Sequence, residues 1–251
     1  REERRGRKRK ARKLDWCYMT EDEDNNANEE PKKEDGDTEY LNFDPDARVV
    51  KILGDDLIRD HTTGIMELIK NGYDADAENV SVELRNITDR DYAEIIIRDD
   101  GTGMTPETIK GPWCQPAHGA KESAKNRLEK TKKGRLPLGE KGVGRFAAQK
   151  LGKSLTLVTR TEGAAEEITV EIDWTKFESG SSLRDVKFPF KKTSLKHFLG
   201  DQHGTLLIMK GPLSKIKKAD VEKLQVSLMR LLSPSESIKD FAVTLKCSAY
   251  P

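Results

Sequence analysis

Apolar residues recur at two different spacings from about residue 41 onward, and each spacing predicts one kind of element. In the stretch DDLIRDHTTGIMELIKNGYDADA, at 55–77, apolar side chains fall on one side of a helix: Leu57, Ile58, Ile65, Leu68 and Ile69. The pattern predicts a single helix there. Further helices are predicted at 143–152, where Gly152 stops the helix, and at 220–232, which ends before Pro234.

Alternating or β-branched runs predict the strands. They lie at 79–84, 93–99, 154–161, 166–174, 204–210 and 241–247, and the third and fourth read as a hairpin. Residues 105–138 have no steady period and are rich in Gly, Pro and Lys, so we expect a long loop with a short helix. Strands that follow one another, with the helices grouped, favour an α+β fold with a mixed sheet covered on one face. A doubly wound fold would alternate strands and helices throughout.

Composition narrows the class of protein. The chain has 251 residues, is 35% charged and 35% hydrophobic, and carries a net charge of +1, so no overall charge draws it to nucleic acid or membrane. Cys17, Cys114 and Cys247 share no C-x-x-C spacing, which argues against a zinc site or a disulfide framework and favours an intracellular protein. No run of eighteen apolar residues predicts a membrane span.

Charge is concentrated at the start of the chain. Residues 1–13 hold nine Lys or Arg, and 21–39 are rich in Asp, Glu and Asn. We therefore expect a charged, low-complexity segment at 1–40, a domain at 41–215 with its loop at 105–138, and a helix and strand at 216–251 leading into a following domain. The basic run has two interpretations: a nucleic-acid or nuclear-localisation arm, or a solvated tail.

Three polar residues share one stripe of the first predicted helix. Glu67, Asn71 and Asp74 are spaced i, i+4 and i+7, so they lie within about 40° of one another. The stripe borders the apolar face of the helix, where polar groups need partners. A bound metal and a polarised water would supply them.

Three glycine-containing motifs are candidates for ligand contacts. In RDDGTGM, a strand ends at Asp99, and Gly101 and Gly103 leave room for a flat ligand; the alternative is an ordinary acidic turn. In GEKGVGRF, three glycines at 139–144 precede a helix and could offer N–H groups to an anion, or form a hinge. The spacing matches neither a P-loop nor the dinucleotide fingerprint. Thr205 opens a strand and could donate to a base, or be an ordinary strand residue.

The order of these motifs resembles the GHKL ATPase superfamily, which includes gyrase-type topoisomerases, heat-shock chaperones, histidine kinases and MutL proteins. The resemblance covers about 48–211 and implies a two-layer Bergerat-type α/β sandwich with a mostly antiparallel sheet. The GEKGVGRFA glycine box looks most like stand-alone prokaryotic-type ATP-binding proteins. The resemblance to the superfamily also implies that residues 105–138 form a lid over ATP.

The resemblance implies a role for each matching residue. Glu67 would orient the attacking water as general base, Asn71 would bind magnesium, and Asp74 would line the nucleotide pocket. Asp99 would accept a hydrogen bond from the adenine amino group, together with Thr205. The base would be walled by Gly101, Gly103 and Met104. The phosphates would be wrapped by Gly139, Lys141, Gly142, Val143, Gly144 and Arg145.

These roles imply ATP and magnesium as cofactors and a homodimer while ATP is bound, driving a downstream partner domain. Histidine kinases usually have Asn where this chain has Glu67, so water is the expected phosphate acceptor and the protein an ATPase. Lys141 could sense the γ-phosphate, as could a basic residue of the lid; a solvated side chain is the alternative for each. The alternative function is a nucleotide-gated dimerisation module with negligible turnover. Such a module could serve a DNA transaction, chromatin or phage defence, with 1–13 gripping nucleic acid.

Overall fold

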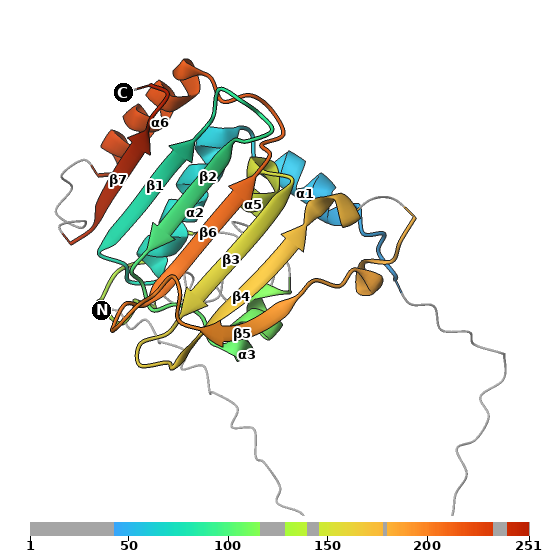
Figure 1. Cartoon of the computed structure of the whole chain (residues 1–251), viewed down its shortest axis with the longest axis horizontal. Helices are drawn as coiled ribbons and strands as arrows, with labels where there is room; N and C mark the ends of the chain where they lie inside the picture. The colour runs from blue at the N-terminus through green and yellow to red at the C-terminus, as the bar shows by residue number, and fades with distance from the viewer. Residues whose placement is uncertain (1–42, 116–128, 140–145, 178–179, 233–239, 251) are drawn as a thin grey trace, which may run out of the picture. The chain divides into compact units, whose positions relative to one another are not determined.

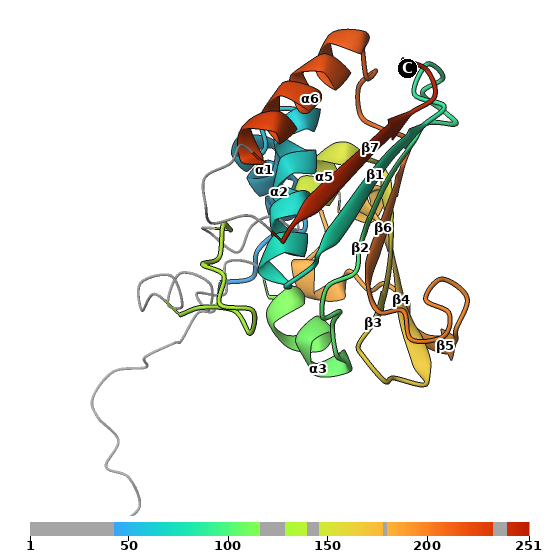
Figure 2. The same ribbon diagram turned by 90° about the vertical axis from the view of Figure 1, so that its left-hand side faces the viewer.

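Seven strands form one mixed sheet, and the helices lie together against one of its faces (Figures 1 and 2). This computed structural model describes residues 43–115, 129–139, 146–177, 180–232 and 240–250. The strands stand in the order β5-β4-β3-β6-β2-β1-β7. Only β1 and β7 pair in parallel among the described strands; the other neighbours are antiparallel. The predicted α+β sandwich, with its mostly antiparallel sheet, is confirmed.

The predicted strands are all present. Their bounds are β1 Asn79–Arg85, β2 Glu94–Asp99, β3 Ser154–Arg160, β4 Glu166–Asp173, β6 Gly204–Lys210 and β7 Ala242–Cys247. β3 and β4 form the predicted hairpin. The pattern gave no sign of β5, Phe190–Ser194, whose five residues FKKTS include four polar ones and carry no alternation of buried and exposed sites.

The helix predicted at 55–77 is wrong in one respect, because two helices occupy this region. α1 runs over Val49–Leu57 and α2 over His61–Asp74. Ile58 is extended, and the carboxylate of Asp60 caps α2 by accepting from the N–H of Thr63 at 2.8 Å. The cap starts a new helix where the apolar pattern alone continues.

The remaining helices agree with the pattern. α5 is Phe146–Leu151 and α6 is Lys218–Leu231. The loop after β2 holds the short helix α3, Pro106–Thr108, which continues into a π-turn at Ile109–Trp113. None of the described helices is both long and apolar enough to cross a membrane.

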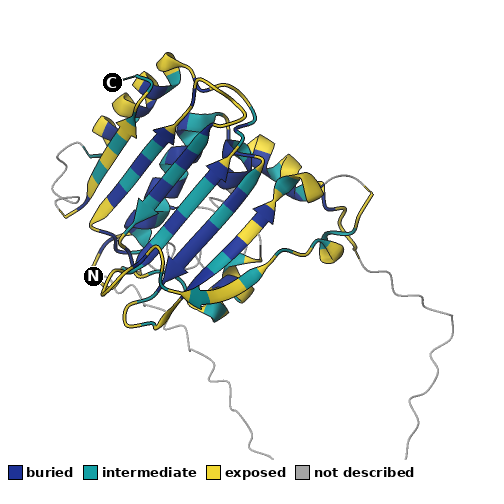
Figure 3. Ribbon diagram, viewed as in Figure 1, coloured by how far each residue is buried: buried dark blue, intermediate teal, exposed yellow. Residues whose placement is uncertain are grey.

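The core lies between the sheet and the helices. On β2, Ile95 and Ile97 are buried toward α2, while Ile96 and Arg98 on the opposite face are only partly buried. β3 differs, since four consecutive residues at its end are buried (Figure 3). Phe198, from the loop before β6, packs on Val158 and covers this end of the helix-free face.

Candidate functional site

Asp99 ends β2 with its carboxylate held by two backbone donors. Its Oδ1 accepts from the N–H of Gly101 at 3.0 Å and from the N–H of Thr205 at 3.1 Å. Among the described residues, Oδ2 accepts no hydrogen bond. Burial raises the pKa of Asp99 to about 6, and the two N–H donors oppose this shift. The site therefore contains a poorly hydrated carboxylate with one oxygen available for a donor.

Gly72 and Gly101 allow the end of α2 to approach this carboxylate. A Cβ on Gly72 would lie 2.9 Å from Val80 Cγ2 and 3.3 Å from Asp99 Cβ. A Cβ on Gly101 would lie 2.7 Å from the carbonyl oxygen of Ala75. Helix α2, which carries the polar stripe, is thus packed directly against the strand end that carries Asp99.

Two further glycines close the loop around Asp99. Gly103 has φ +66°, and a Cβ there would lie 2.1 Å from the carbonyl oxygen of Arg160. Gly204 has φ +127°, and a Cβ there would lie 2.2 Å from the carbonyl oxygen of Asp99. Both the left-handed backbone and the lack of space exclude a side chain.

Thr159 joins the motifs and was missed by the sequence analysis. Its buried hydroxyl accepts from the N–H of Met104 at 2.9 Å and donates to the carbonyl of Gly204 at 2.9 Å. It also lies 3.2 Å from the hydroxyl of Thr205. Thr159 therefore fixes Met104 and Thr205 beside Asp99. In the sequence it is one polar residue within an ordinary strand, so no pattern reveals it.

The loop before β6 is held by buried charges that the sequence analysis also missed. Arg160 donates from Nη1 to the carbonyl oxygens of Phe198, Gly200 and Gln202. Buried Glu167 accepts from the N–H of Phe198, and hydrogen bonding to this loop lowers its pKa although desolvation opposes the shift. The loop leads directly into Thr205, so these residues fix the start of β6.

The stripe on α2 is present, although its members have different contacts. Glu67 forms an ion pair with Lys70, one turn further on, with Nζ and Oε1 2.7 Å apart. Asn71 and Asp74 are partly buried. Asp74 accepts from the N–H of Leu138 at 2.7 Å and from the N–H of Gly139 at 3.1 Å. It therefore anchors the start of the glycine motif to the end of α2.

Some predicted residues lie outside the described part of the chain. They are Lys141, Gly142, Val143, Gly144, Arg145 and the basic run 1–13. Of the basic lid residues, Lys121, Lys125 and Arg127 are also outside it. Arg135 is described and is not the solvated side chain considered above: it is buried and paired with Asp240.

The described residues contain no group of three or more His, Cys, Asp or Glu side chains arranged to hold a metal. Magnesium commonly binds through one or two protein ligands together with substrate phosphates. The amide of Asn71 fits that mode of binding, and a metal cage built only from protein does not fit this site.

Comparison with known proteins agrees with this geometry. Residues 60–205 match the family described as histidine kinase-, DNA gyrase B- and HSP90-like ATPase. The chain is also 26% identical over 180 residues to a protein of Herpetosiphon aurantiacus named putative type II restriction enzyme HgiDII. That alignment covers 72% of this chain but 27% of the relative, so the chain spans little more than a quarter of the relative's length.

Proposed function

Because the chain belongs to the histidine kinase-, DNA gyrase B- and HSP90-like ATPase family, we propose that it is a magnesium-dependent ATP-hydrolysing switch whose adenine site is Asp99. One observation carries the proposal. The Asp99 carboxylate is partly buried, is held through Oδ1 by two backbone N–H groups, and lies against the glycine-containing face of α2.

The adenine end follows from this geometry. Oδ2 of Asp99 accepts the amino hydrogen of the base, and a charged acceptor makes that bond stronger than a neutral one. The Thr205 hydroxyl, held 3.2 Å from Thr159, lies beside it as a second polar contact. The proposal assigns one wall of the base to the backbone at Gly101, Gly103 and Met104, which is fixed by close contact with Ala75 and Arg160 and by the Thr159 hydroxyl.

The phosphate end is assigned to α2 and the glycine motif. Asp74 anchors Leu138 and Gly139, which brings the start of the motif to the C-terminal end of α2. Magnesium, when bound with ATP, would neutralise phosphate charge, and Asn71 would hold it. The proposal assigns Lys141 to γ-phosphate contact and includes closure of 105–138 over the nucleotide and ATP-dependent pairing of two copies.

Glu67 is proposed as the general base. Water attacks the γ-phosphorus, the bond to the β–γ bridging oxygen breaks, and Glu67 takes the proton from the water. The ammonium of Lys70, 2.7 Å from Oε1, holds the Glu67 carboxylate in one orientation. Positioning and electrostatics carry most of such a phosphoryl transfer.

Replacing Glu67 tests the proposal. Glu67→Ala should keep the affinity for ATP but slow hydrolysis by about 10²–10⁴-fold, which is the usual contribution of a general base. Calorimetry measures the affinity, and phosphate release measures turnover. Glu83→Gln, which breaks an exposed ion pair with Arg85 on β1, is the matched control. Unchanged turnover in Glu67→Ala would remove this residue from its role.

A second candidate is a nucleotide-gated binding module with negligible turnover, associated with nucleic acid. The Glu67–Lys70 pair favours it, because the ammonium lies 2.7 Å from a carboxylate oxygen that a general base would need for its contact with water. The relative named as a restriction enzyme favours the nucleic-acid part. Single-turnover hydrolysis separates the two candidates, because the switch hydrolyses its bound ATP and the binding module does not. If residues 1–13 bind DNA, the affinity for DNA should fall steeply as the salt concentration rises.

A further inference from the structure

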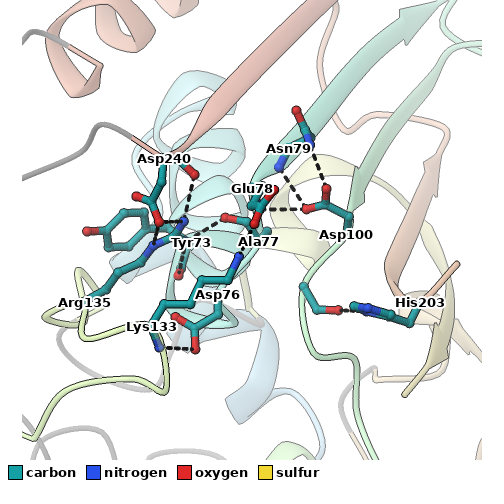
Figure 4. A network of polar contacts seen from close by, with 11 residues as sticks. Tyr73, Asp76, Ala77, Glu78, Asn79, Asp100, Lys133, Arg135, His203 and Asp240 are labelled. Atoms are coloured by element: carbon teal, nitrogen blue, oxygen red, sulfur yellow. Dashed lines mark hydrogen bonds and ion pairs between the residues drawn. The ribbon is translucent and has the colours of Figure 1, made fainter. Parts of the chain in front are cut away.

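Arg135 joins three segments that are far apart in the sequence (Figure 4). Its Nη1 donates to the carbonyl oxygens of Tyr73 at 3.2 Å and Ala77 at 2.6 Å, at the end of α2. Nε and Nη2 donate to the Asp240 carboxylate at 3.2 and 2.7 Å, and Nη2 also donates to the Asp240 carbonyl at 2.9 Å. Asp240 lies just before β7, so one side chain connects the segment before the glycine motif, the end of α2 and the start of β7.

The guanidinium is buried and fully engaged. Its carbon lies 4.6 Å from the ring centre of Tyr73 and 5.7 Å from that of Phe241. Five hydrogen bonds account for its five N–H donors. An ion pair with a buried guanidinium adds little stability compared with apolar packing, so filling this space does not require an arginine. A planar fork with five fixed donors instead imposes one geometry on the three segments.

That geometry reaches the candidate nucleotide site over a short length of backbone. Three and four residues after Arg135, the N–H groups of Leu138 and Gly139 donate to Asp74. A second connection exists at Lys133, whose N–H donates to Asp76 at 3.2 Å and whose ammonium pairs with Glu78. The stretch 133–139 is therefore fastened to the end of α2 at both of its ends, with Arg135 between them.

We propose that Arg135 is a positioning residue that makes the affinity for the triphosphate depend on how β7 is docked. The inference rests on the proposed function, because it takes Asp74 and Gly139 to lie at the phosphate end of the site. A shift of Asp240 moves or releases the Arg135 fork. The backbone at 135–139 then loses its fixed position against α2. The adenine end is held separately by Asp99, Thr159 and Thr205, so it stays unchanged.

Asp240→Asn tests the coupling with little risk to the fold, since the Asp240 side chain is 51% exposed. A non-hydrolysable ATP analogue with magnesium and plain adenosine are titrated by calorimetry into wild type and variant. Affinity for the analogue should fall about three- to tenfold, the usual range for a residue that modulates coupling, and adenosine affinity should not change. The control is Glu171→Gln, which breaks the ion pair of Glu171 with Lys191 at a side chain that is 49% exposed. It should change neither the affinity for the analogue nor the affinity for adenosine.

Arg135→Lys provides the second arm. It keeps the charge but loses the fork, so it should weaken the analogue at least as much as Asp240→Asn, and adding Asp240→Asn to it should have little further effect. An equal loss of affinity for the analogue and for adenosine, or additive losses of affinity in the double variant, would show that Arg135 has a merely structural role and would overturn the inference. Adenosine that fails to bind wild type would instead overturn the proposed function, and this inference with it.

Discussion

At the residue scale, the carboxylate of Asp99 has opposed roles in stability and in binding. Burial raises its pKa to about 6 from the usual 3.8, so the folded state binds more protons than the unfolded state between these values. The contribution of Asp99 to the free energy of unfolding should therefore fall by about 3 kcal/mol as the pH rises from 4 to 6, and stay level above that range. The proposed contact with adenine needs the ionised form, which is the less stable one.

Asp99→Asn separates the two roles. The amide oxygen can keep the bonds to Gly101 and Thr205, while the amide nitrogen offers hydrogens where the adenine amino group needs an acceptor. We expect the variant to be more stable than wild type at pH 7 in urea unfolding without nucleotide. Adenosine affinity should fall at least about tenfold, since a hydrogen bond to a charged group contributes about 1.5–3 kcal/mol. Adenosine is the probe because it carries no phosphate groups. Its affinity therefore reports the contact of the base with Asp99, without phosphate charges that themselves titrate near pH 6. Equal adenosine affinity would count against the pocket.

The sequence alone could place some residues in the candidate site and not others. Asp99 and Gly103 were predictable, because an acid at a strand end followed by two glycines is a local pattern. Thr159 and Arg160 were not, because each looks like an ordinary strand residue until β6 is paired alongside β3. Their importance comes from neighbours more than 35 positions away, and no local pattern contains those neighbours.

At the element scale, the break between α1 and α2 depends on one capping residue. Asp60 accepts from the N–H and the hydroxyl of Thr63 and pairs with Lys223 of α6. Although burial opposes the shift, these contacts lower its pKa to about 2. Apolar spacing continues through this region, so the periodicity alone predicted one helix. The cap at Asp60 and the extended backbone of Ile58 divide the region into two helices.

Asp60→Ala should therefore lower the free energy of unfolding by about 1 kcal/mol, the usual cost of losing an N-cap, measured in urea at pH 7. Asp60→Asn keeps a capping oxygen and should recover most of that loss. Because the folded pKa is depressed, the stabilisation by wild-type Asp60 is present above pH 4 and is lost as the pH falls toward 2. A stability difference between Asp60→Ala and wild type that does not shrink on acidification would contradict this account.

At the scale of the whole molecule, the order of the strands was beyond what local patterns can give. β6 inserts between β3 and β2, and β7 adds in parallel to β1, so neighbours in the sheet come from distant parts of the chain. Periodicity locates strands but does not pair them. The order of strands and helices predicted the α+β class, and the resemblance of the ordered motifs to a known superfamily implied the mostly antiparallel sheet.

The proposed ATP-bound homodimer can be tested through one exposed apolar residue. Leu136 is 50% exposed and lies two residues before Leu138, which Asp74 holds. A contact made by Leu136 in a second copy would therefore be sensitive to what occupies the phosphate end of the site.

With a non-hydrolysable ATP analogue and magnesium, sedimentation should show twice the mass seen with ADP. Leu136→Ser should weaken this association about tenfold or more, the usual effect of truncating a central contact, without lowering monomer stability. Leu199→Ser, at 60% exposure on the loop before β6, is the matched control. A single mass under both nucleotides would refute the dimer, and equal weakening by the two variants would place the contact elsewhere.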